Sequence, residues 1–76
     1  MIKIKLSLIG CLRLKYSCNI IELSYNVPVK IKQILCDANI SCADVFFVKK
    51  DNLLVNEDYI VKDSCMLKLL PIVGGG

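Results

Sequence analysis

Apolar and polar residues alternate at the start of the chain. From residue 2 to residue 8, an isoleucine or leucine stands at every even position and a lysine or serine at every odd position. Because successive side chains of a β-strand point to opposite faces of a sheet, this period of two predicts a half-buried strand. Gly10 provides a turn residue, and we expect residues 20–25 (IIELSY) to return as the second strand of a hairpin.

The spacing of the apolar residues changes after this second strand. Four apolar residues follow one another at i, i+3, i+4 and i+7: Ile31, Ile34, Leu35 and Ala38. This spacing places them on one face of a helix, which we expect to pack against the sheet. Pro28 suits the first turn of that helix, with Asn26 or Val27 as the cap, and the helix is expected to end near Asn39.

The second half of the chain predicts three more strands, at residues 45–48, 53–56 and 66–72. Residues 49–52 (KKDN) are typical of a turn, and residues 58–60 and 62–64 are expected to be connections. Pro71 has no amide hydrogen, so we expect the pairing of the last strand to stop there. The order ββαβββ predicts an α+β domain, a mixed sheet of four to five strands with one main helix packed across it.

The sequence ends in three glycines, Gly74, Gly75 and Gly76. Bare backbone can enter a slot too narrow for a Cβ atom, and a terminal glycine carboxylate carries no substituent that hinders attack on its carbon. Fully extended, residues 72–76 reach at most about 17 Å. We therefore predict a domain over residues 1–72 and a flexible tail over residues 73–76, with Val73, Gly74 and Gly75 threading into a partner and Gly76 reacting there.

The composition limits the classes of function. With 76 residues, 55% of them apolar, the chain makes one domain that cannot bury all of its apolar surface. The net charge of +3 is modest, and the lysines at positions 3, 5, 30 and 32 are expected on solvated faces, so we expect no nucleic-acid binding. No uncharged stretch is long enough to span a membrane. Residues 8–11 (LIGC) resemble a lipoprotein cleavage box, but the apolar stretch before Cys11 is too short for a signal peptide. We expect a cytoplasmic protein that starts at Met1.

Five cysteines are many for this length, at positions 11, 18, 36, 42 and 65. There is no C-x-x-C spacing and no histidine in the sequence, so no metal site is predicted. Without a secretory signal, disulfides are not expected, and the thiols are expected in the core or incidentally at the surface. The sequence also has no Ser/His/Asp set and no Walker loop, so we expect a protein that is not an enzyme.

The element order, the length and the glycine end resemble the MoaD/ThiS family of ubiquitin-like (β-grasp) sulfur carriers. Residues 10–13 (GCLR) resemble the G-x-L-R at the first hairpin of MoaD-type members, and residues 59–63 (YIVKD) resemble the approach to the last strand. Residues 70–76 (LPIVGGG) resemble the C-terminal residues of this family's sequences. The chain departs from the family at residues 63–65, where Asp-Ser-Cys replaces Asp-Gly-Asp, and in having one proline before the glycines. The resemblance favours the molybdopterin synthase small subunit type.

This resemblance implies a carrier cycle. An E1-like enzyme uses ATP to adenylate the Gly76 carboxylate, a sulfur donor converts the acyl-adenylate to a thiocarboxylate, and a synthase accepts the sulfur for molybdopterin. The carrier itself would hold no cofactor and no metal. Four alternatives stay open: a thiamin thiazole sulfur carrier, a ubiquitin-like modifier conjugated through Gly76, an interaction domain with an idle tail, and a redox or metal protein built on the cysteines.

Overall fold

A computed structural model describes residues 1–71 of the chain. Seven strands, two α-helices and one 3-10 turn follow one another in these residues. In chain order they are β1 (Ile2–Leu8), α1 (Cys11–Tyr16), β2 (Ile20–Tyr25), β3 (Val29–Lys30), α2 (Ile31–Asp37), η1 (Cys42–Asp44), β4 (Val45–Lys50), β5 (Leu53–Val55), β6 (Ile60–Val61) and β7 (Cys65–Pro71).

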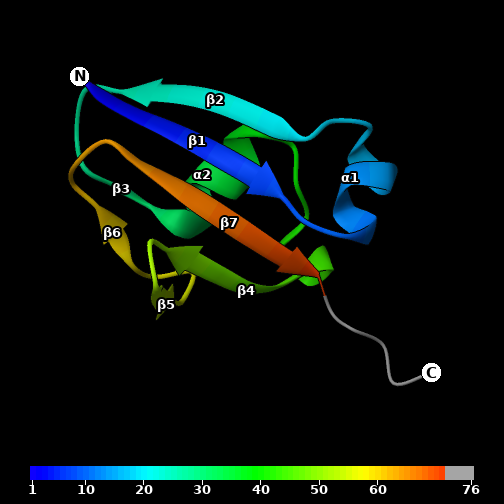
Figure 1. Cartoon of the computed structure of the whole chain (residues 1–76). Coiled ribbons are helices and arrows are strands. Elements are labelled where there is room, and N and C mark those ends of the chain that lie inside the picture. The colour runs from blue at the N-terminus through cyan, green and yellow to red at the C-terminus, as the bar shows by residue number, and fades with distance from the viewer. Residues whose placement is uncertain (72–76) are drawn as a thin grey trace.

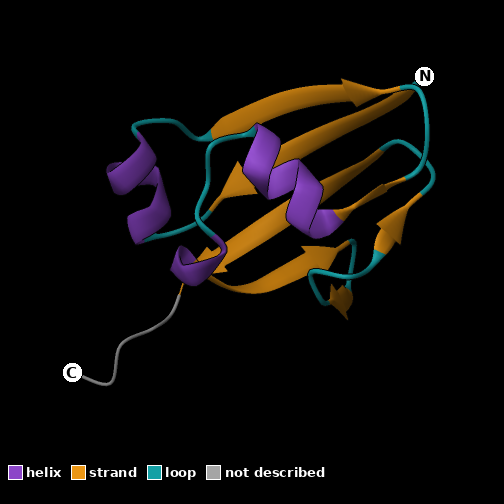
Figure 2. Ribbon diagram, turned by 180° about the vertical axis from the view of Figure 1, so that it is seen from behind, coloured by secondary structure: helices purple, strands orange, loops and turns teal. Residues whose placement is uncertain are grey.

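Five of the strands form one mixed sheet in the order β2-β1-β7-β4-β5. The central pair, β1 and β7, is parallel, and every other neighbouring pair is antiparallel. Helix α2 crosses behind this sheet in Figure 1 and in front of it in Figure 2. The predicted α+β fold, a mixed sheet with one main helix packed across it, is confirmed.

The core lies between α2 and the sheet. β1, α2 and β7 contribute the apolar residues that their periods predict. The fully buried ones among these are Ile4, Leu6, Leu8, Ile31, Ile34, Leu35, Leu67 and Leu69. The even-numbered residues of β1 face α2, and its odd-numbered lysines are exposed. The predicted apolar stripe of the helix is therefore confirmed, with Ala38 partly buried at its end.

Helix α2 begins three residues later than the sequence predicts. Pro28 is not in its first turn, because Val29 and Lys30 form β3 and pair with β6 in a second, two-stranded sheet. Residues 58–60 and 62–64 are predicted to be connections, but Ile60 belongs to β6 together with Val61. Val29 and Val61 close one end of the core, and this burial stabilises a pairing too short to produce a visible period.

The turn after β1 also differs from the prediction, because it contains α1. This helix has one buried residue, Leu12, and one partly buried residue four positions later, Tyr16. In the second half of the chain, β4 extends through Lys50, so the turn is limited to Asp51 and Asn52. None of the helices in residues 1–71 has the length and apolar character needed to cross a membrane.

Candidate functional site

Strand β7 directs the chain to one end of the sheet. It lies between β1 and β4, and its residues Leu67 and Leu69 are fully buried, so its position is set by the core. Its last residue, Pro71, is opposite Val45 of β4. The predicted site residues follow Pro71 and lie outside the described residues: Val73, Gly74, Gly75 and Gly76. That strand pairing stops at Pro71 therefore stays a prediction. The structure thus describes the base of the predicted tail.

Gly10 packs against this base. Its φ of +61° is a backbone angle that residues with a side chain rarely adopt. A Cβ atom at this position would lie 3.4 Å from Cγ of Pro71. The preceding amide, of Ile9, donates a hydrogen bond to the carbonyl of Leu69 at 3.1 Å. This hydrogen bond holds the loop after β1 against the end of β7. The first residue of the G-x-L-R segment is therefore a glycine for steric reasons.

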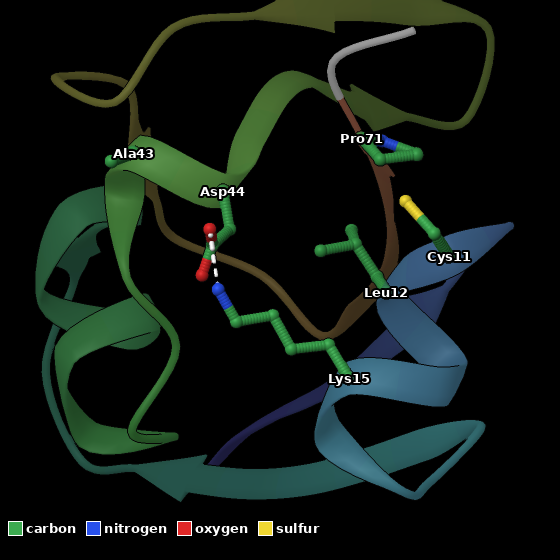
Figure 3. Close-up of a pocket in the computed structure, with 6 residues that line it drawn as sticks. All are labelled: Cys11, Leu12, Lys15, Ala43, Asp44 and Pro71. Atoms are coloured by element: carbon green, nitrogen blue, oxygen red, sulfur yellow. Dashed lines mark hydrogen bonds and ion pairs between the residues drawn. The ribbon is translucent and has the colours of Figure 1, made fainter. Parts of the chain in front are cut away.

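A pocket of about 220 Å³ opens beside Pro71. Helix α1, the turn η1 and β7 contribute its lining: Cys11, Leu12, Lys15, Ala43, Asp44 and Pro71. Figure 3 shows the exposed Cys11 side chain pointing toward the Pro71 ring, with Lys15 and Asp44 on the other side of the opening. The predicted tail would leave the body at the rim of this pocket.

A polar network holds α1 against η1 at this pocket. Asp44 accepts a hydrogen bond from Lys15 Nζ at 2.9 Å and another from the Tyr16 hydroxyl at 2.5 Å. The Tyr16 oxygen in turn accepts a bond from the backbone amide of Ser41 at 3.0 Å. The hydrogen bonds from Tyr16 and then Lys15 lower the pKa of Asp44 below its ordinary value, and Asp44 raises the pKa of Lys15. The network therefore favours the ionised Asp44.

We expect Asp44→Asn to destabilise the protein in a pH-dependent manner. Because the folded pKa of Asp44 is lowered, its stabilisation is present above the pKa of the unfolded chain and is lost as the pH falls through the folded value. Urea denaturation should therefore show a less stable variant at about pH 7 and a smaller difference from wild type at about pH 2. Asp63→Asn, at an exposed residue outside the network, is the control. A difference that does not change with pH would contradict this role.

The five cysteines are free thiols and none of them is buried. Cys18 and Cys65 are half-buried against the core, and the other three are exposed. Burial raises the pKa of the Cys65 thiol, and burial together with Glu57 raises that of Cys42, so both favour the protonated, weakly nucleophilic form. Within residues 1–71, no three His, Cys, Asp or Glu side chains are grouped as metal ligands.

The arrangement of these elements defines the class of protein. A mixed five-stranded sheet with a parallel central pair, one helix packed across it, and a last strand that directs the chain out at one end is the ubiquitin-like β-grasp fold. The chain has this fold, as its resemblance to the MoaD/ThiS family implies.

Comparison with known proteins supports this assignment. No family profile and no curated protein matches the sequence. Among solved structures, a protein assigned as molybdopterin converting factor subunit 1 from Pyrococcus furiosus matches with a TM-score of 0.74 at 11% identity, over 96% of this chain and 100% of the other. SAMP1 from Haloferax volcanii matches with a TM-score of 0.79 at 12% identity, over 97% and 99%. These neighbours show the fold, and the first agrees with the resemblance to MoaD-type proteins.

The sequence predicts the tail but gives no indication of the pocket beside Pro71. The pocket combines α1 with η1, which is far from it in sequence. A local signal for η1 was present, because Ser41 and Asp44 have the spacing of a capped helical turn, and the Ser41 hydroxyl accepts a bond from the Ala43 amide at 3.3 Å. No local pattern, however, indicates that Tyr16 and Lys15 meet Asp44.

Proposed function

We propose that this chain is a ubiquitin-like sulfur carrier that delivers sulfur as a C-terminal thiocarboxylate, with molybdopterin synthesis as the acceptor pathway. One observation carries the proposal. The central strand of a β-grasp domain, anchored by two fully buried leucines, leads through Pro71 to a sequence that closes with three glycines. The structural likeness to a molybdopterin converting factor subunit supports this choice of pathway.

The chemistry starts at the Gly76 carboxylate. A carboxylate is a poor electrophile, so an E1-like partner first transfers AMP from ATP to one of its oxygens and releases pyrophosphate. Hydrosulfide supplied by a donor then attacks the acyl carbon and forms the C–S bond, AMP leaves with the electron pair of the broken C–O bond, and loss of the sulfur-bound proton gives the thiocarboxylate. A synthase finally accepts the sulfur. Val73, Gly74 and Gly75 thread into the partner, and the folded body holds the tail near the reacting atoms.

The carrier is in this proposal a substrate and not an enzyme. ATP and the catalytic groups come from the partners, and the carrier binds no cofactor, metal, nucleic acid or membrane. Because adenylation uses ATP, we place the cycle in the cytoplasm. Burial raises the pKa of the Cys65 thiol, so this thiol stays protonated and contributes no nucleophile to the cycle.

Intact-mass spectrometry tests the proposal. When the full chain is coexpressed with the activating enzyme and a sulfur source, it is expected to gain the mass difference of sulfur replacing one oxygen at Gly76. A chain lacking Gly75 and Gly76 is the control and should not change. A spectrum that shows only the carboxylate, under conditions that charge a known carrier, would count against the proposal.

The sequence of the tail also supports a second candidate for the acceptor of the sulfur. The third glycine resembles the ends of ThiS-like proteins, which carry sulfur for the thiamin thiazole. Incubating the thiocarboxylated chain with a molybdopterin synthase large subunit or with a thiazole synthase separates the two routes, since only the correct acceptor regenerates the carboxylate. Conjugates between Gly76 and lysines of other proteins would instead indicate a ubiquitin-like modifier.

A further inference from the structure

Strand β2 leaves one edge of the main sheet open. Within residues 1–71 it pairs only with β1, and it lies along the upper border of the sheet in Figure 1 and Figure 2. The opposite edge strand, β5, has only three residues, Leu53–Val55. Strand β2 has six, Ile20–Tyr25, and its register with β1 is continuous. The longer edge presents more backbone groups, so β2 is the edge to which a further strand can add.

The register with β1 shows which backbone groups of β2 point outward. The amide of Leu8 donates a hydrogen bond to the carbonyl of Asn19 at 2.8 Å, so the backbone groups of Asn19 face β1. In an antiparallel ladder this direction alternates from one residue to the next. The N–H and C=O groups of Ile20, Glu22 and Ser24 therefore point away from β1. No backbone hydrogen bond within the described part of the chain satisfies them.

The side chains of β2 lack the features that keep an edge strand from pairing. Natural proteins protect such edges with lysine, proline or a β-bulge. Strand β2 (IIELSY) has no lysine and no proline, and its pairing with β1 contains no bulge. Its first residue, Ile20, is 51% exposed. On the side of α2, it presents three apolar side chains that are only half-buried: Ile21, Leu23 and Tyr25. A further strand would cover these side chains as well as bond the backbone.

The sequence of β2 is complementary to itself in one register. When two copies pair antiparallel about a twofold axis, residues opposite each other lie on the same face of the sheet. The two registers with the longest overlap then have the axis at Glu22 or at Leu23. An axis at Glu22 places two carboxylates opposite each other, which destabilises a sheet. An axis at Leu23 instead places Glu22 opposite Ser24 of the second copy, so the charges select this register.

The register centred on Leu23 also satisfies the backbone. Glu22 and Ser24 of the second copy both have outward-pointing groups, so they exchange two N–H···O=C bonds, and the symmetry repeats this exchange. On the face opposite α2, Lys5 lies opposite Glu22 and Lys3 lies opposite Ser24 within each chain. No like charges are therefore directly opposite each other at the junction. A strand of an unrelated protein would need no such match, so the match favours a second copy.

We propose that this chain forms a symmetric dimer through β2, in which two antiparallel β2 strands join the two main sheets into one continuous sheet. The twofold axis is perpendicular to the sheet, so the two β7 strands run in opposite directions. The two copies of Pro71 then lie at opposite ends of the joined sheet. The inference goes beyond the proposed function and does not rest on it, because it uses only the edge of the sheet.

Sedimentation equilibrium of the full chain tests the inference. The concentration runs from about 10 μM to about 1 mM, because the pairing of one strand makes a small interface. We expect a monomer–dimer equilibrium. Ser24→Glu places a carboxylate opposite Glu22 of the second copy at two symmetric positions, so the Kd of the dimer should rise by about tenfold or more. Ser7→Glu makes the same change of charge on β1, one strand away from the edge, and should change the Kd by less than about twofold.

Thermal melting of dilute protein checks the fold of the variant. Residue 24 is opposite Lys3 within one chain, so Ser24→Glu should keep or raise the Tm of the monomer. If Ser24→Glu lowers the Tm instead, Ser24→Pro takes its place in the sedimentation experiment. A proline is tolerated at an edge where the N–H group points away from the sheet, and it removes two symmetry-related bonds of the dimer.

A double variant tests the register itself. Glu22→Ser combined with Ser24→Glu exchanges the two side chains, so a carboxylate again lies opposite a serine hydroxyl of the second copy. The net charge is that of wild type, and the Kd should return to within about threefold of the wild-type value. A double variant that dimerises as weakly as Ser24→Glu alone would overturn the inference.

Amide hydrogen exchange measured by NMR locates the interface. Raising the concentration should slow exchange at Glu22 and Ser24, whose amides become donors in the dimer, more than at Leu23, whose amide already faces β1. A chain that stays monomeric over the whole range overturns the inference, as does a dimer in which Glu22 and Ser24 exchange at the monomer rate. Intact-mass spectrometry of Ser24→Glu coexpressed with the activating enzyme measures charging separately. The dimer and the sulfur-carrier function therefore hold or fail independently.

Discussion

Gly75→Val is expected to abolish charging of the carrier while its Tm stays nearly unchanged. Valine adds a β-branched side chain where threading into a narrow slot requires bare backbone, and it restricts the φ and ψ angles available to the tail. The predicted domain covers residues 1–72, so we expect the folded body to lose no contact on which its stability depends. Pyrophosphate release by the activating enzyme and the intact mass of the product measure the loss, and differential scanning calorimetry measures the Tm.

The same substitution at Gly10 is the matched control. There a valine meets a φ of +61° and the ring of Pro71 at the same time, so Gly10→Val should lower the Tm. Comparing Gly75→Val with Gly10→Val thus distinguishes a residue needed for sulfur delivery from a residue needed for folding. A large drop in Tm for Gly75→Val would show that the tail belongs to the fold, and normal charging would show that no narrow slot receives it.

Ile34→Ala is expected to destabilise the protein by about 2–5 kcal/mol, because it leaves a cavity between α2 and the sheet. Ile34 is fully buried in the core. Domains of this size have a total stability of only about 5 kcal/mol, so a loss at the upper end of this range would leave the variant largely unfolded. Urea denaturation followed by circular dichroism gives the free energy of unfolding of both proteins.

Lys32→Ala is the control on the same helix. Its side chain is exposed, and its ion pair with Asp58, at 3.5 Å, is between two exposed groups, so the substitution should change stability little. Comparable losses for Ile34→Ala and Lys32→Ala would mean that the helix presents a different face to the sheet. The register that brings β7 and Pro71 to the end of the sheet would then also be wrong.

The elements that could be predicted from sequence are those with several buried residues at a regular period. β1 and β7 alternate over seven residues each, and both were predicted to within one residue of their bounds. The apolar stripe located α2, but the helix begins three residues later and ends earlier than predicted. β3 and β6 have two residues each and are strands only because they pair with each other. α1 has one buried residue, and a single residue has no period. The tail was inferred from composition alone and stays a prediction.

The pocket could not be predicted for a different reason. Its walls come from α1, η1 and β7, and the contacts between them depend on how α2 and the sheet place the intervening chain. Nothing in the sequence distinguishes Lys15 and Asp44 from the other charged residues. Their ion pair follows from the tertiary fold, and no spacing along the chain encodes it.

The parallel pairing of β1 with β7 also determines when the protein can fold during its synthesis. These neighbours at the centre of the sheet come from opposite ends of the described chain, and β7 brings Leu67 and Leu69 to the middle of the core. A nascent chain that has not released β7 from the ribosome therefore lacks its central strand and cannot close the sheet. On the proposed function, the closed sheet and the tail that follows β7 would become available to a partner together. Partly made chains would then never compete for the activating enzyme.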